Sequence, residues 1–212
     1  METEVKKKVD QSSLTEEELL ERIQTEQGCP ICSAILDFEF NQISHVQYDV
    51  TYIEEIRKQV AREGGFCDFH FRQFKKIANG KTNILLLKSV VEESAYKKNN
   101  FIAECRICVN VNKYEENLIK VFVNLILRKE IRSTFENTNG ICFVHLRQVN
   151  NLLEDEIIKK WLNEIHVQQI ERMQSDFENM SQFKSFYEIE RKKRRLINIL
   201  IEKLAGRKTG AL

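Results

Sequence analysis

The sequence GFCDFH, at residues 65–70, decides the fold that we expect, because GICFVH at residues 140–145 repeats its pattern. Both begin with glycine, an apolar residue and cysteine, and both end with a histidine three positions after the cysteine. The likeness continues beyond the histidine, where an apolar residue, arginine and glutamine follow in the same register in FRQF and LRQV. Self-similarity at a fixed spacing of about 75 residues indicates a duplicated structural unit.

A Cys-x-x-Cys motif precedes each of these sequences, namely CPIC at residues 29–32 and CRIC at residues 105–108. All six cysteines of the chain, and two of its four histidines, fall in these paired motifs. Three thiolates and one imidazole form a common ligand set of structural zinc sites. We therefore predict two Zn²⁺ ions per chain. The predicted ligands are Cys29, Cys32, Cys67, His70, Cys105, Cys108, Cys142 and His145.

The sequence leaves open which motifs share a metal ion. Pairing within a repeat is the simplest hypothesis, because one helix out and one helix back would return the chain to its start. The alternative is a swapped pairing, in which the first Cys-x-x-Cys motif joins the second Cys-x-x-His motif. The spacing in Cys-x-x-His places both ligands on one face of a helix. Gly65 and Gly140 permit a positive φ at the entry to that helix. An iron–sulfur cluster is the less favoured cofactor, because such clusters usually take four cysteines.

Long segments without helix breakers predict an all-α protein. The 212-residue chain has one proline and seven glycines. The segments between them are rich in leucine, isoleucine, glutamate, lysine and arginine, which favour helices. We expect the following order: a flexible tail (1–13), a helix (14–28), a first zinc-binding helical repeat (29–104), a second zinc-binding helical repeat (105–155), C-terminal helices (156–205) and a tail (206–212).

Local signals predict several boundaries. Thr15 and Glu18 match a capping box at the start of the first helix. The alternation of apolar residues over 46–52 is compatible with a short strand. The flanking periodicity instead favours two antiparallel helices with a turn near Asp49. A long helical run is expected from the second Cys-x-x-Cys motif to about Arg132.

The C-terminal part is expected to form two further helices. Apolar residues recur every three to four positions over 157–180, which predicts an amphipathic helix. The last helix is expected over about residues 186–204, and it contains the basic run RKKRR at residues 191–195. Such a run can contact phosphate, but glutamates lie nearby and we interpret it as a solvated helix face. A protein is therefore the favoured partner, and nucleic acid is weakly supported.

Charge and hydropathy narrow the class of protein further. The formal net charge of +1 argues against a basic surface that covers the whole molecule. No run approaches the roughly 18 to 20 apolar residues that cross a bilayer, so no membrane partner is expected. The N-terminal residues lack the apolar core of a secretory signal. We therefore expect a cytoplasmic protein. In that compartment, clustered cysteines more often bind metal than form disulfides.

Three functional hypotheses follow from the motifs. The favoured one is a non-enzymatic protein whose zinc sites join helix N-termini and whose helical surface binds a partner. A thiol switch that loses zinc on oxidation is the first alternative, which exposed cysteines of low pKa would favour. A metal-dependent enzyme is the second, although four protein ligands leave no open coordination position. His45 and His166 lack a partner signature, and we interpret them as partly exposed helix residues.

The paired motifs resemble a prokaryotic family of unknown function in which CPxC and GFCxxH elements recur in helical chains. The resemblance rests on residues 29–32, 65–70, 105–108 and 140–145, and on the closing IEKLAG at residues 201–206. CRIC and GICFVH differ from CPIC and GFCDFH at some positions but keep every predicted ligand. The resemblance implies an α-helical metal-binding protein and supplies no substrate.

Overall fold

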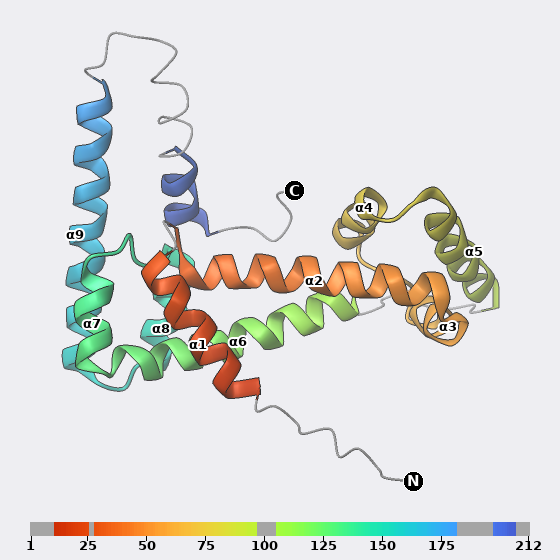
Figure 1. The fold of residues 1–212 in the computed structure, drawn as a ribbon, viewed down its shortest axis with the longest axis horizontal. Coiled ribbons are helices and arrows are strands. Elements are labelled where there is room, and N and C mark those ends of the chain that lie inside the picture. The colour runs from red at the N-terminus through yellow and green to blue at the C-terminus, as the bar shows by residue number, and fades with distance from the viewer. Residues whose placement is uncertain (1–10, 26–27, 97–104, 182–196, 207–212) are drawn as a thin grey trace. The chain divides into compact units, whose positions relative to one another are not determined.

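The computed structural model describes residues 11–25, 28–96, 105–181 and 197–206. These residues form helices and no strand, which confirms the predicted all-α class (Figure 1). The helices are α1 (Gln11–Thr25), α2 (Pro30–Tyr52), α3 (Glu54–Arg62), α4 (Asp68–Ile77), α5 (Gly80–Tyr96), α6 (Arg106–Ile126), α7 (Lys129–Glu136), α8 (Phe143–Leu152) and α9 (Glu156–Ser181). Residues 197–205 form a further helical segment.

The duplication in the sequence reappears as a repeated order of four helices. A long helix begins inside the Cys-x-x-Cys motif, a short helix follows, a third helix begins at the Cys-x-x-His motif, and a long helix closes the repeat. This order describes α2 to α5 and again α6 to α9. The cysteine of each Cys-x-x-His motif is a helix N-cap: Cys67 caps α4 and Cys142 caps α8. The predicted helix entries at these motifs are thus confirmed.

The chain divides into two compact units, and each unit combines segments of both sequence repeats. Among the described residues, the first unit contains 11–25, 28–34, 116–181 and 197–206. The second unit contains residues 35–96 and 105–115. Consequently the first turn of α2 belongs to the first unit and the rest of α2 to the second. The first half of α6, up to residue 115, belongs to the second unit, and its remainder belongs to the first.

Aromatic side chains form the core of the first unit. Phe135 of α7 is 1% exposed, and its ring lies 5.5 Å from that of Phe122 on α6 and 6.2 Å from that of Trp161 on α9. Burial of such large apolar rings dominates the packing energy of a core. An ion pair of 2.7 Å between Arg128 and Glu16 also links the start of α7 to α1.

In the second unit, α2 and α6 pack in antiparallel directions. The rings of Phe38 and Tyr114 stack at 4.1 Å, and the amide of Asn110 donates a hydrogen bond of 2.9 Å to Gln42. Moving along α2 from Phe38 to Gln42 thus corresponds to moving back along α6 from Tyr114 to Asn110, so the two helices run in opposite directions. The hydroxyls of Thr51 and Thr82, 2.8 Å apart, tie the end of α2 to the start of α5.

Three predicted boundaries need correction. The helix α2 continues through Asp49 to Tyr52, and the chain breaks at Ile53, whose backbone is extended with φ −114° and ψ 101°. The strand over 46–52 is therefore wrong, and the predicted turn lies four residues later. Thr15 lies inside α1, which begins at Gln11, so it does not cap the helix start.

The long helical run predicted to reach Arg132 is interrupted, because α6 ends at Ile126 and α7, which ends at Glu136, begins at Lys129. Arg128 between them is extended, with ψ 127°. The side chain of Arg132 donates to the carbonyl oxygens of Ile126 and Leu127 at 3.0 and 2.9 Å. Because the last carbonyls of a helix lack intrahelical donors, this side chain stabilises the end of α6.

The basic run at residues 191–195, and most of the last predicted helix, lie outside the described residues. Within the described part, no helix combines the length and apolar character needed to cross a membrane. The cytoplasmic location stays a prediction.

Candidate metal centres

The eight predicted ligands come together in two groups of four. Site 1 consists of Cys29, Cys32, Cys142 and His145, and site 2 consists of Cys67, His70, Cys105 and Cys108. Within each group, the candidate ligand atoms all lie within 4.8 Å of one another. Site 1 lies in the first unit and site 2 in the second. The favoured pairing within a repeat is therefore wrong, and the swapped pairing that the sequence left open is the observed one.

The lengths of the helices explain the swapped pairing. The 23 residues of α2 span about 35 Å at a rise of about 1.5 Å per residue, whereas the nine residues of α3 span only about 14 Å. At the end of α3 the chain has therefore returned less than half of the way to Cys29, and only four residues remain before Cys67. The second repeat shows the same difference in length, because α6 has 21 residues and α7 has eight. Each Cys-x-x-His motif consequently meets the Cys-x-x-Cys motif of the other repeat.

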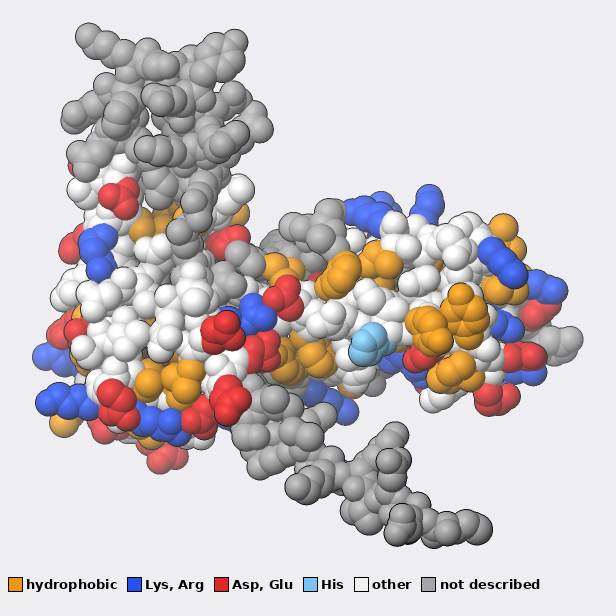
Figure 2. All heavy atoms as spheres, viewed as in Figure 1, with side chains coloured by type: hydrophobic (Ala, Val, Ile, Leu, Met, Phe, Trp, Pro, Cys, Tyr) orange, Lys and Arg blue, Asp and Glu red, His pale blue; other side chains and the backbone are white. Residues whose placement is uncertain are grey.

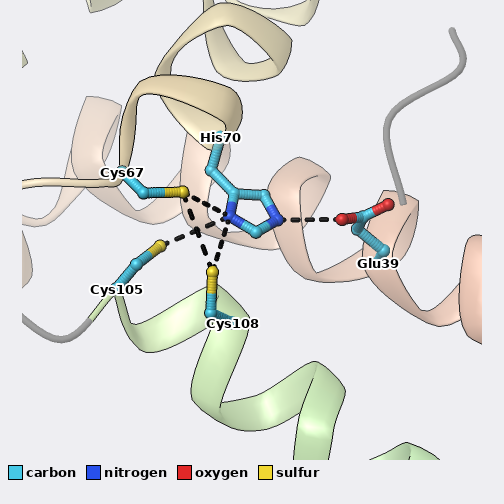
Figure 3. A network of polar contacts seen from close by, with 5 residues as sticks. All are labelled: Glu39, Cys67, His70, Cys105 and Cys108. Carbon is cyan, nitrogen blue, oxygen red and sulfur yellow. Dashed lines mark hydrogen bonds and ion pairs between the residues drawn. The ribbon is translucent and has the colours of Figure 1, made fainter. Parts of the chain in front are cut away.

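Site 2 has the spacing of a tetrahedral metal centre (Figure 3). The Nδ1 atom of His70 lies 3.2 Å from Cys67 Sγ, 3.4 Å from Cys105 Sγ and 3.3 Å from Cys108 Sγ. The sulfur atoms of Cys67 and Cys108 are 3.7 Å apart. For tetrahedral zinc, bond lengths of about 2.3 Å to sulfur and about 2.0 Å to nitrogen place two sulfurs about 3.8 Å apart and sulfur and nitrogen about 3.5 Å apart. The donor set fits such an ion.

Site 1 has nearly the same dimensions. Its Nδ1 atom, from His145, lies 3.3 Å from Cys29 Sγ, 3.4 Å from Cys32 Sγ and 3.2 Å from Cys142 Sγ. The sulfur atoms of Cys32 and Cys142 are 3.7 Å apart, as in the equivalent pair of site 2. All four ligands of site 1 are buried, whereas Cys67 and Cys108 of site 2 are half-buried.

Helix N-termini meet at both sites. In site 1, the Sγ of the N-cap Cys142 accepts a hydrogen bond of 3.5 Å from the backbone N–H of His145. The helices α2 and α6 begin at Pro30 and Arg106, directly after the first cysteine of each Cys-x-x-Cys motif. Because free amides and the helix dipole favour negative charge at a helix start, these ends stabilise thiolates.

Without a metal ion, the thiols and imidazoles of each site shift one another's pKa values. Hydrogen bonds from Cys29 and Cys32 hold the pKa of Cys142 well below its usual range, while hydrogen bonding to Cys142 and Cys29 raises the pKa of Cys32. At site 2, burial opposes ionisation of Cys105, but hydrogen bonds from His70 and from backbone amides lower its pKa to about 6. A divalent cation that binds these ligands must therefore displace protons.

A buried carboxylate, which the sequence did not indicate to us, orients the histidine of site 2. The Oε1 atom of Glu39 on α2 lies 2.9 Å from Nε2 of His70, and Glu39 is 4% exposed (Figure 3). The Nε2 atom donates to this carboxylate, and Nδ1 therefore faces the three sulfurs. Carboxylate–histidine pairs of this kind fix the ring and raise its basicity as a ligand.

The pKa of His70 agrees with this arrangement. Burial opposes its protonation, but hydrogen bonds with Cys105 and Glu39 raise the pKa to about 10 in the absence of metal. A signal for Glu39 was present in the sequence. A glutamate stands ten positions after the first cysteine of each Cys-x-x-Cys motif, as Glu39 and Glu115.

A buried lysine lies near site 1. Lys203, in the C-terminal helical segment, is 4% exposed and donates from Nζ to the carbonyl oxygen of Asn139 and to Oε1 of Gln169. Burial lowers the pKa of Lys203 to about 8, while nearby Cys29 and Cys142 favour its charged form. Three thiolates and one Zn²⁺ carry a net charge of about −1. Lys203 places a positive charge beside this centre, and no motif in the sequence pointed to it.

The two histidines outside the motifs differ in their surroundings. His45 is exposed, whereas His166 of α9 is buried against Phe143, with ring centroids 4.7 Å apart. Our interpretation of His166 as a partly exposed residue is therefore wrong. Neither of its ring nitrogens has a hydrogen-bond partner among the described residues. Burial and the charge of Lys203 lower the pKa of His166 to about 4, so its ring is neutral at pH 7.

The fold and the sites define the class of molecule: an all-α chain with two Cys₃His groups that can each hold a metal ion. No family model, no curated protein and no solved structure matches the chain. The resemblance to the family with paired CPxC and GFCxxH elements therefore stays a prediction.

Proposed function

We propose that this chain is a non-enzymatic zinc protein in which two structural Cys₃His sites fix a helical scaffold that binds another protein. The observation that carries the metal assignment is the arrangement of three sulfurs and one nitrogen at both sites, with sulfur–nitrogen distances of 3.2 to 3.4 Å. Each site joins the start of a Cys-x-x-Cys helix to the start of a Cys-x-x-His helix. A metal ion at each site would thus tie residues that are far apart in the sequence.

The donor set favours zinc over the alternatives. Thiolate and imidazole ligands in a tetrahedral arrangement suit Zn²⁺, whereas Mg²⁺ and Ca²⁺ prefer oxygen. An iron–sulfur cluster is less favoured, because such clusters usually have four cysteine ligands. An enzyme is also disfavoured, because catalytic zinc sites commonly have three protein ligands and an open fourth position. The sites offer four protein donors each.

We expect two zinc ions per chain in protein purified without added metal. Four preorganised donors at each site give high affinity, and zinc binding in small zinc domains contributes on the order of 10 kcal/mol. Elemental analysis of the purified chain measures the ratio directly. A ratio near zero, or iron accompanied by visible absorbance, would contradict the assignment.

The surface of the second unit supports a protein partner. The apolar residues Ile84, Leu87 and Val91 of α5 follow one another at helical spacing, and each is at least half exposed. Such spacing places them along one helix face. Figure 2 shows hydrophobic side chains on the visible surface, with acidic and basic side chains interspersed. Nucleic acid binders more often show a continuous basic surface.

The role of this apolar face of α5 can be tested by comparing proteins that co-purify with the native chain and with Leu87→Glu. Placing a charge in an apolar interface costs affinity. Gln59→Glu, at an exposed polar position of α3, is the matched control. A partner retained by the control and lost from Leu87→Glu supports the proposal. Equal recovery by all three chains would contradict it for this face.

A further inference from the structure

The two sites contain equivalent sulfur pairs that differ in exposure. Cys67 and Cys108 in site 2 are separated by 3.7 Å between sulfur atoms, and so are Cys32 and Cys142 in site 1. The site 1 pair is closed to solvent, with exposed fractions of 2% for Cys32 and 0% for Cys142. Both members of the site 2 pair are half-buried. The two pairs can therefore be compared directly, because their sulfur–sulfur distances are equal and their exposure to solvent differs.

Nearby residues also shield the sulfur atoms of site 1. The C-terminal segment passes over Cys142, because a Cβ atom added at Gly206 would lie 3.5 Å from Cys142 Sγ. The buried Lys203 of the same segment is anchored on the carbonyl oxygen of Asn139.

Site 2 differs from site 1 in the charge beside it and in solvent access. Glu39 accepts a hydrogen bond from His70 and adds a negative charge beside a centre that would carry three thiolates with zinc bound. Oxidation of cysteine follows thiolate character and solvent access. Zinc binding would make all three cysteines of site 2 thiolates, and among them Cys67 and Cys108 are half-buried whereas Cys105 is buried.

We propose that Cys67 and Cys108 are the oxidisable pair of this protein, and that a hydroperoxide converts them to a disulfide and releases the metal ion of site 2 alone. This inference rests on the proposed zinc binding. It assigns a modification site to one of the two centres, and it leaves the metal of site 1 as a permanent part of the scaffold.

The reaction balances with hydrogen peroxide as the oxidant. The thiolate of one cysteine attacks a peroxide oxygen, which breaks the O–O bond and gives a sulfenic acid and, after protonation, one water molecule. The second thiolate attacks the sulfenic sulfur, forms the S–S bond, and displaces hydroxide, which takes a proton to become the second water molecule. Two thiolates, one peroxide and two protons thus give one disulfide and two waters. The sulfur atoms must approach from 3.7 Å to about 2.05 Å.

Loss of the metal follows from the ligand count. The disulfide removes two of the three thiolates, and only Cys105 and His70 remain as donors at site 2. Structural zinc sites have four ligands, so two are insufficient to retain the ion. The oxidised pair would also join the N-terminus of α4 covalently to the first turn of α6, because Cys67 caps α4 and Cys108 lies near the start of α6.

The test uses the intact zinc-loaded chain treated with increasing hydrogen peroxide. Released zinc is followed with a colorimetric chelator, and the cysteines are assigned by peptide mass mapping after alkylation of free thiols. We expect loss of one of the two zinc ions, accompanied by a peptide that links Cys67 to Cys108. Cys32 and Cys142 should remain reduced and alkylatable only after denaturation at that stage.

The internal control is the site 1 pair, which has the same sulfur spacing. Simultaneous loss of both zinc ions, or a Cys32–Cys142 disulfide in the first product, would overturn the inference. Release of one zinc with only sulfinic or sulfonic acids and no Cys67–Cys108 link would also overturn it. The zinc content before treatment tests the proposed function separately, so a chain that binds no zinc is distinguished from one that oxidises at the wrong site.

Discussion

Replacing Cys67 with serine is expected to empty site 2, leave about one zinc ion per chain, and loosen both α4 and the first turns of α6. The physical reason is that Cys67 and Cys105 belong to the same site, although they lie in different sequence repeats. Zinc binding and folding are coupled, with energies on the order of 10 kcal/mol in small zinc domains. We expect partial unfolding in this larger chain, because its helical core persists. Elemental analysis and hydrogen exchange measure the two effects.

Hydrogen exchange also tests the swapped pairing. In Cys67→Ser, amides at the start of α2, next to Cys29, should keep their protection because site 1 remains occupied. In Cys142→Ser, the start of α2 should lose protection together with α8, and the start of α6 should keep it. Pairing within a repeat would give the reverse result for α2 and α6. Unchanged metal content and melting temperature in Cys67→Ser would contradict the structural role of the metal.

The ligand set could be predicted from the sequence because coordination chemistry imposes local spacing. Two residues between ligands and a glycine before the Cys-x-x-His motif are constraints that act within one turn of chain. The pairing could not be predicted in this way. It depends on the difference in length between α2 and α3, and the break at Ile53 that sets this difference lacks glycine and proline.

The residues that surround the ligands were harder to predict for a related reason. Glu39 and Lys203 are charged side chains on helices, and such residues are usually exposed. Their burial follows from packing against segments far away in the sequence. Lys203, for example, meets Asn139, which lies 64 positions earlier. His166 likewise becomes buried through its contact with Phe143. The periodicity of a helical sequence predicts on which face of the helix a residue lies, but it does not predict which other element packs against that face.

Replacing Gly140 with alanine is expected to destabilise the first unit by about 2 to 4 kcal/mol, because two independent costs act at this position. Its φ of +72° lies in the left-handed region, which alanine disfavours. A Cβ atom there would also lie 1.8 Å from Oε1 of Gln169, whose amide group is held by Phe135 and Lys203. Because Gly140 precedes Cys142 by two residues, the shift should weaken metal binding at site 1. Thermal unfolding and zinc content measure both effects.

Gly80→Ala is the matched control for this prediction. Gly80 is the first residue of α5, has no positive φ, and a Cβ atom there would meet no heavy atom within 4 Å. Alanine at such a position reduces the entropy of the unfolded chain and should leave stability unchanged or raise it by about 0.5 kcal/mol. In a chain of this length, about 3 kcal/mol lowers the melting temperature by roughly 6 to 12 °C. Equal melting temperatures for Gly140→Ala and Gly80→Ala would show that the loop before Cys142 adapts freely, and the argument that this glycine holds the cysteine in place would then fail.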